Sequence, residues 1–306
     1  MPAVAWALVL GGMTAVPTPA AAVAAAASAL PVAPPPVAAD RVLIVAPHID
    51  DEAIGAAGYA AAALAAGAEV AVCYLTAGDY NRTSNRILES GVKPRTAAFL
   101  ALGGRRIQEA QAAMALLGVA ADHLYLLGYP DGGLKRMLDA PGQLVRAPGT
   151  GRTAVPYRAA LSPGAPYRLP SLLADLGTVL ARTRPTVVIL PAPFDSHTDH
   201  SAGCRITLAA VAASGQRPRL LGYLVHAARF PFPFLLAPHH PLLPPRRLAR
   251  EPWSIFPLSP AAVAAKRRVL GAYQSQRADL YLRVLFDAFV RTNELFVRLD
   301  LPAGEP

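Results

Sequence analysis

Histidines and aspartates occur together in two short segments of this chain. Residues 47–52 read Pro-His-Ile-Asp-Asp-Glu, and residues 195–200 read Asp-Ser-His-Thr-Asp-His. Imidazole nitrogens and carboxylate oxygens are the ligands of hydrolytic zinc sites, which keep one coordination position open for water. The two segments together therefore predict a metal site that supports hydrolysis.

The residue types suggest a role for each side chain in such a site. His48, Asp51 and His200 could supply two imidazoles and one carboxylate to the metal. Asp50 would then stand beside the metal as a base, and His197 would face the substrate. The alternative is structural, because an aspartate that follows a strand is often the cap of the next helix.

The elements that must position these residues alternate along the chain. Apolar, β-branched runs predict five strands, and apolar residues at helical spacing predict the helices between them. The expected strands are residues 41–46, 69–75, 123–127, 186–190 and 220–225, and the expected helices are residues 52–66, 106–117, 171–182 (capped by Ser171) and 201–213. This order predicts an α/β fold, a Rossmann-like, doubly wound and mostly parallel sheet flanked by helices.

The two segments that contain these histidines and aspartates each follow a predicted parallel strand. In doubly wound sheets, ligands bind beyond the carboxyl ends of the strands, where the strand order reverses. We therefore expect residues 47–52 and 195–200 to converge on one mouth of the sheet. No Gly-rich phosphate-binding fingerprint follows the first strand, which excludes a dinucleotide-binding protein of the usual type.

The segments between and after these elements are less regular. We expect a long loop with a short helix at 78–104, a Gly- and Pro-rich loop at 140–168 and a Pro-rich, surface-wrapping arm at 229–259. Residues 260–299 predict a closing helical segment and an edge strand. The stretch 80–104 reads either as a lid or substrate wall, or as a surface insertion.

Composition limits the class of protein. The chain has 306 residues, 53% of them hydrophobic and 16% charged, which is typical of a folded domain with a sizeable core. Its net charge of +9 comes from scattered arginines without a recognition-helix pattern, so nucleic-acid binding is not expected. The two cysteines, Cys73 and Cys204, are too few for a disulfide framework and predict buried thiols.

The first 39 residues differ from the rest, because no charged side chain occurs before Asp40. Residues 3–15 form an apolar block as long as the core of a signal peptide, and Ala22-Val23-Ala24 is a candidate cleavage site. Pro31 to Pro36 then predicts an extended linker. We expect an export signal and a periplasmic or secreted protein without a membrane span after cleavage; an Ala/Pro tail on a cytoplasmic protein is the alternative.

Several motifs resemble those of one family, the PIG-L/LmbE-like de-N-acetylases. Residues 48–52 resemble its HPDDE motif, and residues 197–200 resemble its HPDH motif. Further similarities run in the family's order through residues 41–299: Leu75–Asp79 is similar to its TDGE-type turn, Arg106–Glu109 with Leu117–Val119 to its R-x-x-E…LGV helix, Gly128–Asp131 to its YPD turn, Tyr273–Gln276 to its SQ motif and Asn293–Phe296 to its E-x-F ending.

Two positions depart from the family pattern. Ile49 and Thr198 stand where the two motifs usually have proline. Neither position supplies a ligand, so we expect changes in loop geometry and no loss of metal. The resemblance implies one deacetylase domain at 40–300, which follows the export segment and linker expected at 1–39 and precedes a tail at 301–306.

The resemblance also implies a reaction, the zinc-dependent removal of an acetyl group from an N-acetylated, GlcNAc-type sugar, with water on one zinc ion as the nucleophile. Asp50 would take the proton of that water. His197 would stabilise the oxyanion or protonate the leaving amine, oriented by a hydrogen bond to the Asp199 carboxylate. Arg106 and Asp131 would line the sugar site; a structural Arg106–Glu109 pair and a turn-forming Asp131 are the alternatives.

Other functions fit the same residues. The fold and the site do not fix the acyl acceptor, so a metal-dependent amidase or esterase acting on a non-sugar substrate is the second reading. A non-catalytic carbohydrate-binding relative would need loss of a ligand or of the base, and His48, Asp50, Asp51 and His200 are all present.

Overall fold

The fold is seen in a computed structural model that describes residues 25–88 and 95–301. The strands are β1 (Arg41–Ala46), β2 (Glu69–Thr76), β3 (Leu124–Tyr129), β4 (Val187–Pro191), β5 (Arg219–Tyr223), β6 (Trp253–Pro257) and β7 (Asn293–Leu299). The helices are α2 (Asp51–Ala65), α3 (Arg82–Leu88), α4 (Thr96–Leu117), α5 (Leu134–Asp139), α6 (Leu169–Thr183), α7 (Thr198–Ala213), α8 (Pro260–Ala272), α9 (Gln274–Arg277) and α10 (Leu280–Ala288), with 3-10 helices at η1 (Ala121–His123) and η2 (Arg246–Leu248).

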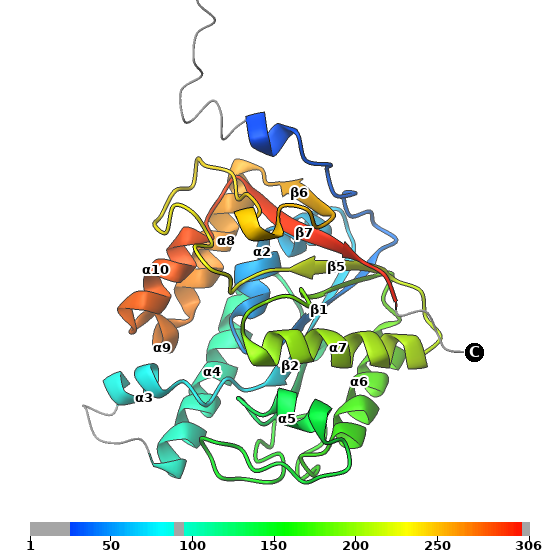
Figure 1. Cartoon of the computed structure of the whole chain (residues 1–306), viewed down its shortest axis with the longest axis vertical. Coiled ribbons are helices and arrows are strands. Elements are labelled where there is room, and N and C mark those ends of the chain that lie inside the picture. Colours follow the sequence, from blue (N-terminus) through cyan, green and yellow to red (C-terminus); the bar gives the residue numbers. More distant parts are fainter. Residues whose placement is uncertain (1–24, 89–94, 302–306) are drawn as a thin grey trace, which may run out of the picture.

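The seven strands form one sheet in the order β3-β2-β1-β4-β5-β7-β6. The five strands from β3 to β5 are parallel, whereas β7 pairs antiparallel with both β5 and β6. Helices α2, α4 and α8 pack together on one side of the sheet, and α5, α6 and α7 pack together on the other (Figure 1). The predicted doubly wound, mostly parallel fold is therefore confirmed.

The strand order explains where a site can form. β1 lies between β2 and β4, so the chain moves outward from β1 in both directions and the order reverses there. The residues of β1 are almost wholly buried, as their apolar run predicts for a strand covered on both faces. The loops after β1 and β4 consequently face each other across the switch point, which is where ligands bind in such sheets.

Several element boundaries differ from those predicted. α4 begins at Thr96, ten residues before the predicted start at Arg106. Gly103 lies within this helix, and a Cβ atom there would clash with the hydroxyl oxygen of Tyr157, so this glycine marks close packing and not a loop. α6 begins at Leu169 with Arg168 in the cap position, so the prediction of a Ser171 cap was wrong.

The C-terminal part was predicted less fully. The closing segment contains three helices, α8, α9 and α10, followed by β7, which lies inside the sheet and not at its edge. The edge strand is β6, and it comes from the segment predicted as an arm. β7 pairs with β5 and with β6, although long stretches of chain separate these strands. Pairing between distant segments leaves no local signal in the sequence of the strands.

The Pro-rich stretch before β1 is extended, as predicted, but it also contacts the folded domain. We call residues 31–36 the strap. Its Pro31 carbonyl accepts from the Ile255 amide at 2.9 Å, and the Ala33 amide donates to the Ile255 carbonyl at 2.8 Å. The Ala33 side chain is buried. The strap thereby covers part of the exposed edge of β6, which a free linker would not do.

This contact gives a first prediction. We expect Ala33→Asp to lower the free energy of unfolding by about 1–3 kcal/mol, because it buries a carboxylate and breaks two edge hydrogen bonds. Urea unfolding measures the loss, and Ala39→Asp, at an exposed position of the same segment, is the control. Equal unfolding midpoints for the two variants would show that the strap contributes nothing to stability.

The predicted signal sequence and its cleavage site fall in residues 1–24, outside the described residues, so export stays a prediction. No helix among the described residues is both long and apolar enough to cross a bilayer. Cys73 and Cys204 are free, buried thiols, as expected.

Candidate metal centre

The structure brings the three predicted metal ligands into mutual contact at the switch point. His48 Nδ1 lies 3.1 Å from Asp51 Oδ2, and His200 Nε2 lies 3.1 Å from the same oxygen. The two imidazole nitrogens are 3.3 Å apart. Two imidazoles and one carboxylate thus direct one atom each toward a common point, a donor set that suits zinc with an open position.

Local backbone structure positions these side chains. Asp50 caps α2 with a φ angle of +120°, a conformation that residues other than glycine rarely adopt. Its amide donates to Glu52 Oε2 at 3.0 Å, and the Tyr273 hydroxyl donates to the other oxygen of Glu52. A strained residue held in this way is typical of functional sites. This backbone conformation directs Asp50 and Asp51 toward the same end of the sheet.

The side chains of residues 195–200 are positioned by the N-terminus of α7. His197 is the cap residue of this helix, and its Nδ1 accepts from the Asp199 amide at 3.3 Å. The predicted start at residue 201 was therefore three residues late, since α7 begins at Thr198. His200 lies in the first turn and points its Nε2 toward His48.

Carboxylates support the outer nitrogens of both histidines predicted as ligands. Asp195 Oδ2 lies 3.1 Å from His200 Nδ1, and Asp195 also accepts from the Val225 and His226 amides. Asp131 Oδ1 lies 3.2 Å from His48 Nε2. Hydrogen bonds of this kind fix the tautomer and the ring orientation of histidines that bind metals.

Asp199 differs from its predicted role. Its Oδ2 lies 3.4 Å from His48 Nε2, and its two oxygens accept from the Gly132 and Leu134 amides. The carboxylate therefore supports the ring of His48, whereas its predicted partner His197 is bonded to the Asp199 backbone amide. The helix start explains this, because the Asp199 side chain points away from the cap residue toward the loop before α5.

The electrostatics of the cluster favour a cation. Burial alone would lower the pKa of His200, but Asp51 and Asp195 raise it to about 10. Burial likewise opposes a raised pKa at His48, yet Asp131, Asp199 and Asp51 bring that pKa well above its ordinary value. The pKa of Asp51 is well below its ordinary value because the attraction of His200 outweighs burial. A divalent cation would replace these imidazole protons, and the residues present fit zinc.

The candidate base Asp50 is paired with Arg106. The guanidinium lies 2.9 Å from Asp50 Oδ2 and also donates to the carbonyls of Ile49 and Gly78. Burial raises the pKa of Asp50 to about 8, although Arg106 opposes the shift. Arg106 lines the pocket but is almost fully buried, so its contacts in the structure hold the base and its loop, and its role toward sugar stays a prediction.

The structure also shows the contacts of Glu109 and Asp131, for which the sequence left structural alternatives. Glu109 does not pair with Arg106; its carboxylate accepts from the amide and hydroxyl of Ser275 at 2.8 and 2.6 Å. Asp131 accepts from the Tyr80 amide at 2.7 Å while it contacts His48. It therefore joins the turn after β3 to the candidate metal centre.

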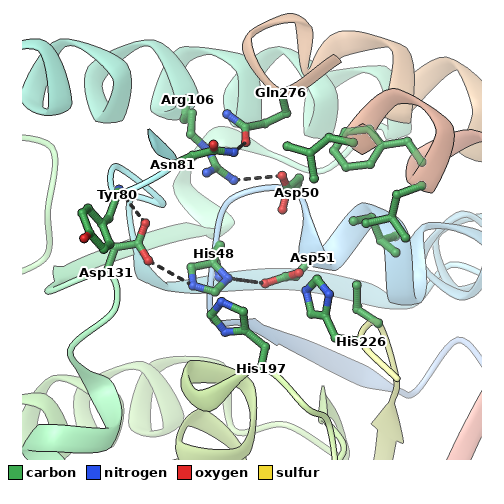
Figure 2. A pocket seen from close by; sticks show the side chains of 15 residues that line it. His48, Asp50, Asp51, Tyr80, Asn81, Arg106, Asp131, His197, His226 and Gln276 are labelled. Atoms are coloured by element: carbon green, nitrogen blue, oxygen red, sulfur yellow. Dashed lines mark hydrogen bonds and ion pairs between the residues drawn. The ribbon is translucent and has the colours of Figure 1, made fainter. Parts of the chain in front are cut away.

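A pocket opens above these residues, and Figure 2 shows His48 between Asp51 and Asp131, with Asp50 facing Arg106. Tyr80, Asn81 and Gln276 continue its polar side, with Asn81 Nδ2 donating to Gln276 Oε1 at 2.7 Å. The segment predicted as a lid or insertion therefore contributes a wall at its start. The opposite side is apolar and consists of Ile54, Val225, Leu282, Leu285 and Phe286.

Sequence reasoning missed one histidine of the pocket. His226 follows β5, and its ring centroid lies 4.9 Å from that of His200 and 5.3 Å from that of His197. Burial and the neighbouring His200 lower its pKa to about 4, so the ring is neutral near pH 7. Its position at the carboxyl end of a predicted strand was an available signal.

A buried ion pair holds the helix that carries the site. Lys266 Nζ donates to Glu294 Oε1 and to the Ile54 carbonyl, both at 2.7 Å. The Glu294 carboxylate also accepts from the Gly58 and Tyr59 amides at 2.8 and 2.7 Å. Both side chains are almost fully buried. The pair thus links α8 and β7 to the middle of α2.

This pair gives a second prediction. We expect Lys266→Met to lower the free energy of unfolding by about 3–5 kcal/mol, because it leaves the buried Glu294 carboxylate without its counter-ion. The control is Lys135→Met, which removes the exposed pair with Asp139 and should cost less than about 1 kcal/mol. Urea unfolding compares the two, and equal losses would contradict the assignment.

Comparisons with known proteins agree with this architecture. A family model described as "PIG-L: GlcNAc-PI de-N-acetylase" matches residues 43–211, more than half of the chain. A 1D-myo-inositol 2-acetamido-2-deoxy-alpha-D-glucopyranoside deacetylase of Actinosynnema mirum is 36% identical over 183 residues, which span 59% of this chain and 58% of the relative.

Solved structures share the fold at low sequence identity. The A40926 pseudoaglycone deacetylase Dbv21 superposes with a TM-score of 0.56 at 19% identity, covering 87% of this chain and 99% of that one. The N,N'-diacetylchitobiose deacetylase of Pyrococcus horikoshii superposes with a TM-score of 0.50 at 19% identity, covering 78% and 71%. These matches extend the likeness beyond the residues that the family model covers.

Proposed function

Because the chain belongs to the PIG-L family, the GlcNAc-PI de-N-acetylases, we propose that it is a zinc-dependent hydrolase that removes the acetyl group from an N-acetylated sugar. The family resemblance inferred from the motifs is thereby confirmed. The observation that carries the proposal is the contact of His48, Asp51 and His200 beside the strained Asp50. The related deacetylase of Actinosynnema mirum acts on a 2-acetamido sugar by its name, which supports this substrate class.

His48, Asp51 and His200 would hold the metal. A zinc ion bound there would act as a Lewis acid, which lowers the pKa of water and polarises an amide carbonyl. Asp131 and Asp195 keep the outer nitrogens of the two histidines protonated, so that the inner nitrogens remain free to coordinate.

Asp50 is the proton acceptor in the proposed reaction. Its carboxylate faces the pocket, and Arg106 fixes it at 2.9 Å. A base works best when its pKa is close to the working pH, and burial brings the pKa of Asp50 toward neutrality. Asp50 accepts a proton from the attacking water and returns it to the leaving amine.

His197 stabilises the oxygen of the amide as it gains charge. Burial and the nearby His48 lower the pKa of His197 to about 4, so the ring is neutral. Its Nδ1 accepts from the Asp199 amide, so the ring proton lies on Nε2. That N–H is free to donate to the developing oxyanion.

Asn81 and Gln276 are the best placed groups for sugar hydroxyls. Both line the polar side of the pocket, and their amides are joined to each other at 2.7 Å. Amide side chains both donate and accept, as hydroxyl recognition requires.

The proposal is tested with the purified full-length chain, stripped of metal and reloaded with zinc. Release of free amine and of acetate is followed with a panel of N-acetylglucosaminides, short N-acetylated oligosaccharides, simple amides and esters. We expect zinc-dependent release from the sugars. Silence with the sugars and turnover of an amide or ester would replace the proposal by an amidase or esterase on another substrate.

A further inference from the structure

Large apolar side chains are exposed beside the pocket. We call them the arm patch, and they come from the loop before β6 and from the first turn of α10. Eleven large hydrophobic residues are exposed in the described part of the chain, and six of them belong to this patch. They are Phe232 (79% exposed), Phe234 (38%), Leu235 (52%), Leu236 (37%), Leu280 (63%) and Tyr281 (61%).

The two parts of the arm patch are joined by aromatic stacking. The rings of Phe234 and Tyr281 lie 5.6 Å apart between centroids with an interplanar angle of 30°. The loop and the helix therefore form one continuous apolar surface. A cluster of this kind on a soluble domain is typical of a binding site, whereas single exposed apolar residues are ordinary.

A buried arginine fixes the loop in this conformation. Arg291 is fully buried, and its guanidinium donates to the carbonyls of Pro233, Leu235, Ala237 and Ala288. Burying a guanidinium is costly, and burial lowers the pKa of Arg291 to about 10. The chain thus uses a buried cation to hold a backbone whose apolar side chains point outward.

The arm patch and the apolar side of the pocket share the helix α10. α10 contributes Leu280 and Tyr281 to the patch and, within the next two turns, Leu282, Leu285 and Phe286 to the pocket lining. In Figure 1 the yellow segment that carries the loop lies next to the orange-red α10. Tyr281 and Leu285 are four residues apart on this helix and so lie on the same face, which links the patch to the pocket.

We propose that the arm patch binds an apolar aglycone, an alkyl, acyl or aryl group attached to the N-acetylated sugar. The inference rests on the proposed function and narrows its substrate to amphiphilic glycosides. The sugar lies on the polar side of the pocket, against Asn81 and Gln276, and the aglycone leaves along α10. Covering the patch removes apolar surface from water, which favours such a substrate over a short-chain one.

The test compares two soluble substrates with the zinc-loaded, full-length chain. They are methyl and octyl N-acetyl-β-D-glucosaminide, with the octyl glycoside kept below the concentration at which it forms micelles. We expect kcat/KM for the octyl glycoside to be higher by about tenfold or more, mainly through a lower KM. Equal kcat/KM values for the two glycosides would overturn the inference.

Variants at exposed positions link the preference to the patch. In the triple variant Phe232→Ser, Leu235→Ser and Tyr281→Ser, and more weakly in Phe232→Ser alone, the octyl-to-methyl ratio should fall toward one. Leu116→Ser removes a leucine that is 53% exposed on α4 and should keep the ratio unchanged. A triple variant that keeps the full ratio would also overturn the inference.

A binding measurement separates this inference from the proposed function. If neither glycoside is hydrolysed, the proposed function fails, and calorimetry with the same octyl and methyl N-acetyl-β-D-glucosaminides then tests the patch directly. Tighter binding of the octyl compound that is lost in the triple variant supports the inference. Equal binding of both compounds, together with patch-dependent binding to phosphatidylglycerol vesicles or patch-dependent dimerisation, assigns the surface to a membrane or to a second copy instead.

Discussion

We expect Asp50→Asn to hydrolyse N-acetylated sugars about 10²–10⁴-fold more slowly than the unchanged protein while it still binds one zinc ion per chain. Asparagine has the shape of aspartate but cannot take a proton from water. The proposed ligands His48, Asp51 and His200 are untouched. The loss should therefore appear in kcat and not in the zinc content.

The variant is also expected to fold. The Asp50 carboxylate is buried, and its replacement by a neutral amide removes a charge from a site where burial already raises the pKa to about 8. The amide oxygen still accepts from Arg106, so the loop keeps its main contact. The urea midpoint should be close to that of the unchanged protein, and a large decrease would make the kinetic result uninformative about chemistry.

Arg106 provides a matched comparison, because it touches the base and not the reacting atoms. Arg106→Lys loses the hydrogen bonds to the carbonyls of Ile49 and Gly78 but keeps the base Asp50, so kcat should fall less than in Asp50→Asn. The pH profile of kcat should shift, because Arg106 influences the pKa of Asp50. Asp139→Asn, on the exposed side of α5, is the neutral control. If Asp50→Asn retains activity within threefold of the unchanged protein, another group is the base.

The part of the fold in which elements consecutive in the sequence also pack together was predictable from the sequence. β1, α2 and β2 have strong local patterns, and their parallel pairing follows from the right-handed crossover rule. The pairs of β5 with β7 and of β7 with β6 join segments far apart in sequence, so local pattern could not indicate them. The strap on β6 is likewise a long-range contact.

The site shows the same division. His48, Asp50 and Asp51 were predictable because one short loop carries them, and His200 because it follows an adjacent strand. The contact of Asp199 with His48 depends on the exact start of α7, and the contact of Arg106 with Asp50 depends on how α4 crosses the sheet. Contacts of this kind depend on tertiary packing, which cannot be inferred from the spacing of residues along the sequence.

Removal of metal is expected to have the largest effect on activity. We expect a chelator to abolish hydrolysis, with restoration on addition of one zinc equivalent per chain, because water without a Lewis acid attacks an amide very slowly. His48→Asn should not retain zinc after dialysis, since it loses a ligand from the centre of the cluster. His239→Asn, an exposed histidine outside the pocket, should keep both zinc and activity.

The proton balance of the cluster makes this prediction quantitative. Asp51 and Asp195 raise the pKa of His200 to about 10, so this imidazole carries an extra proton at pH 7.5 without metal, and Asp131 and its neighbours raise the pKa of His48 as well. Zinc binds the deprotonated nitrogen, so uptake should release up to two protons per ion. Apparent zinc affinity should therefore rise with pH up to the pKa of His200. Titration calorimetry in two buffers of different ionisation enthalpy counts the protons, and uptake without proton release would show that His48 and His200 do not bind the metal.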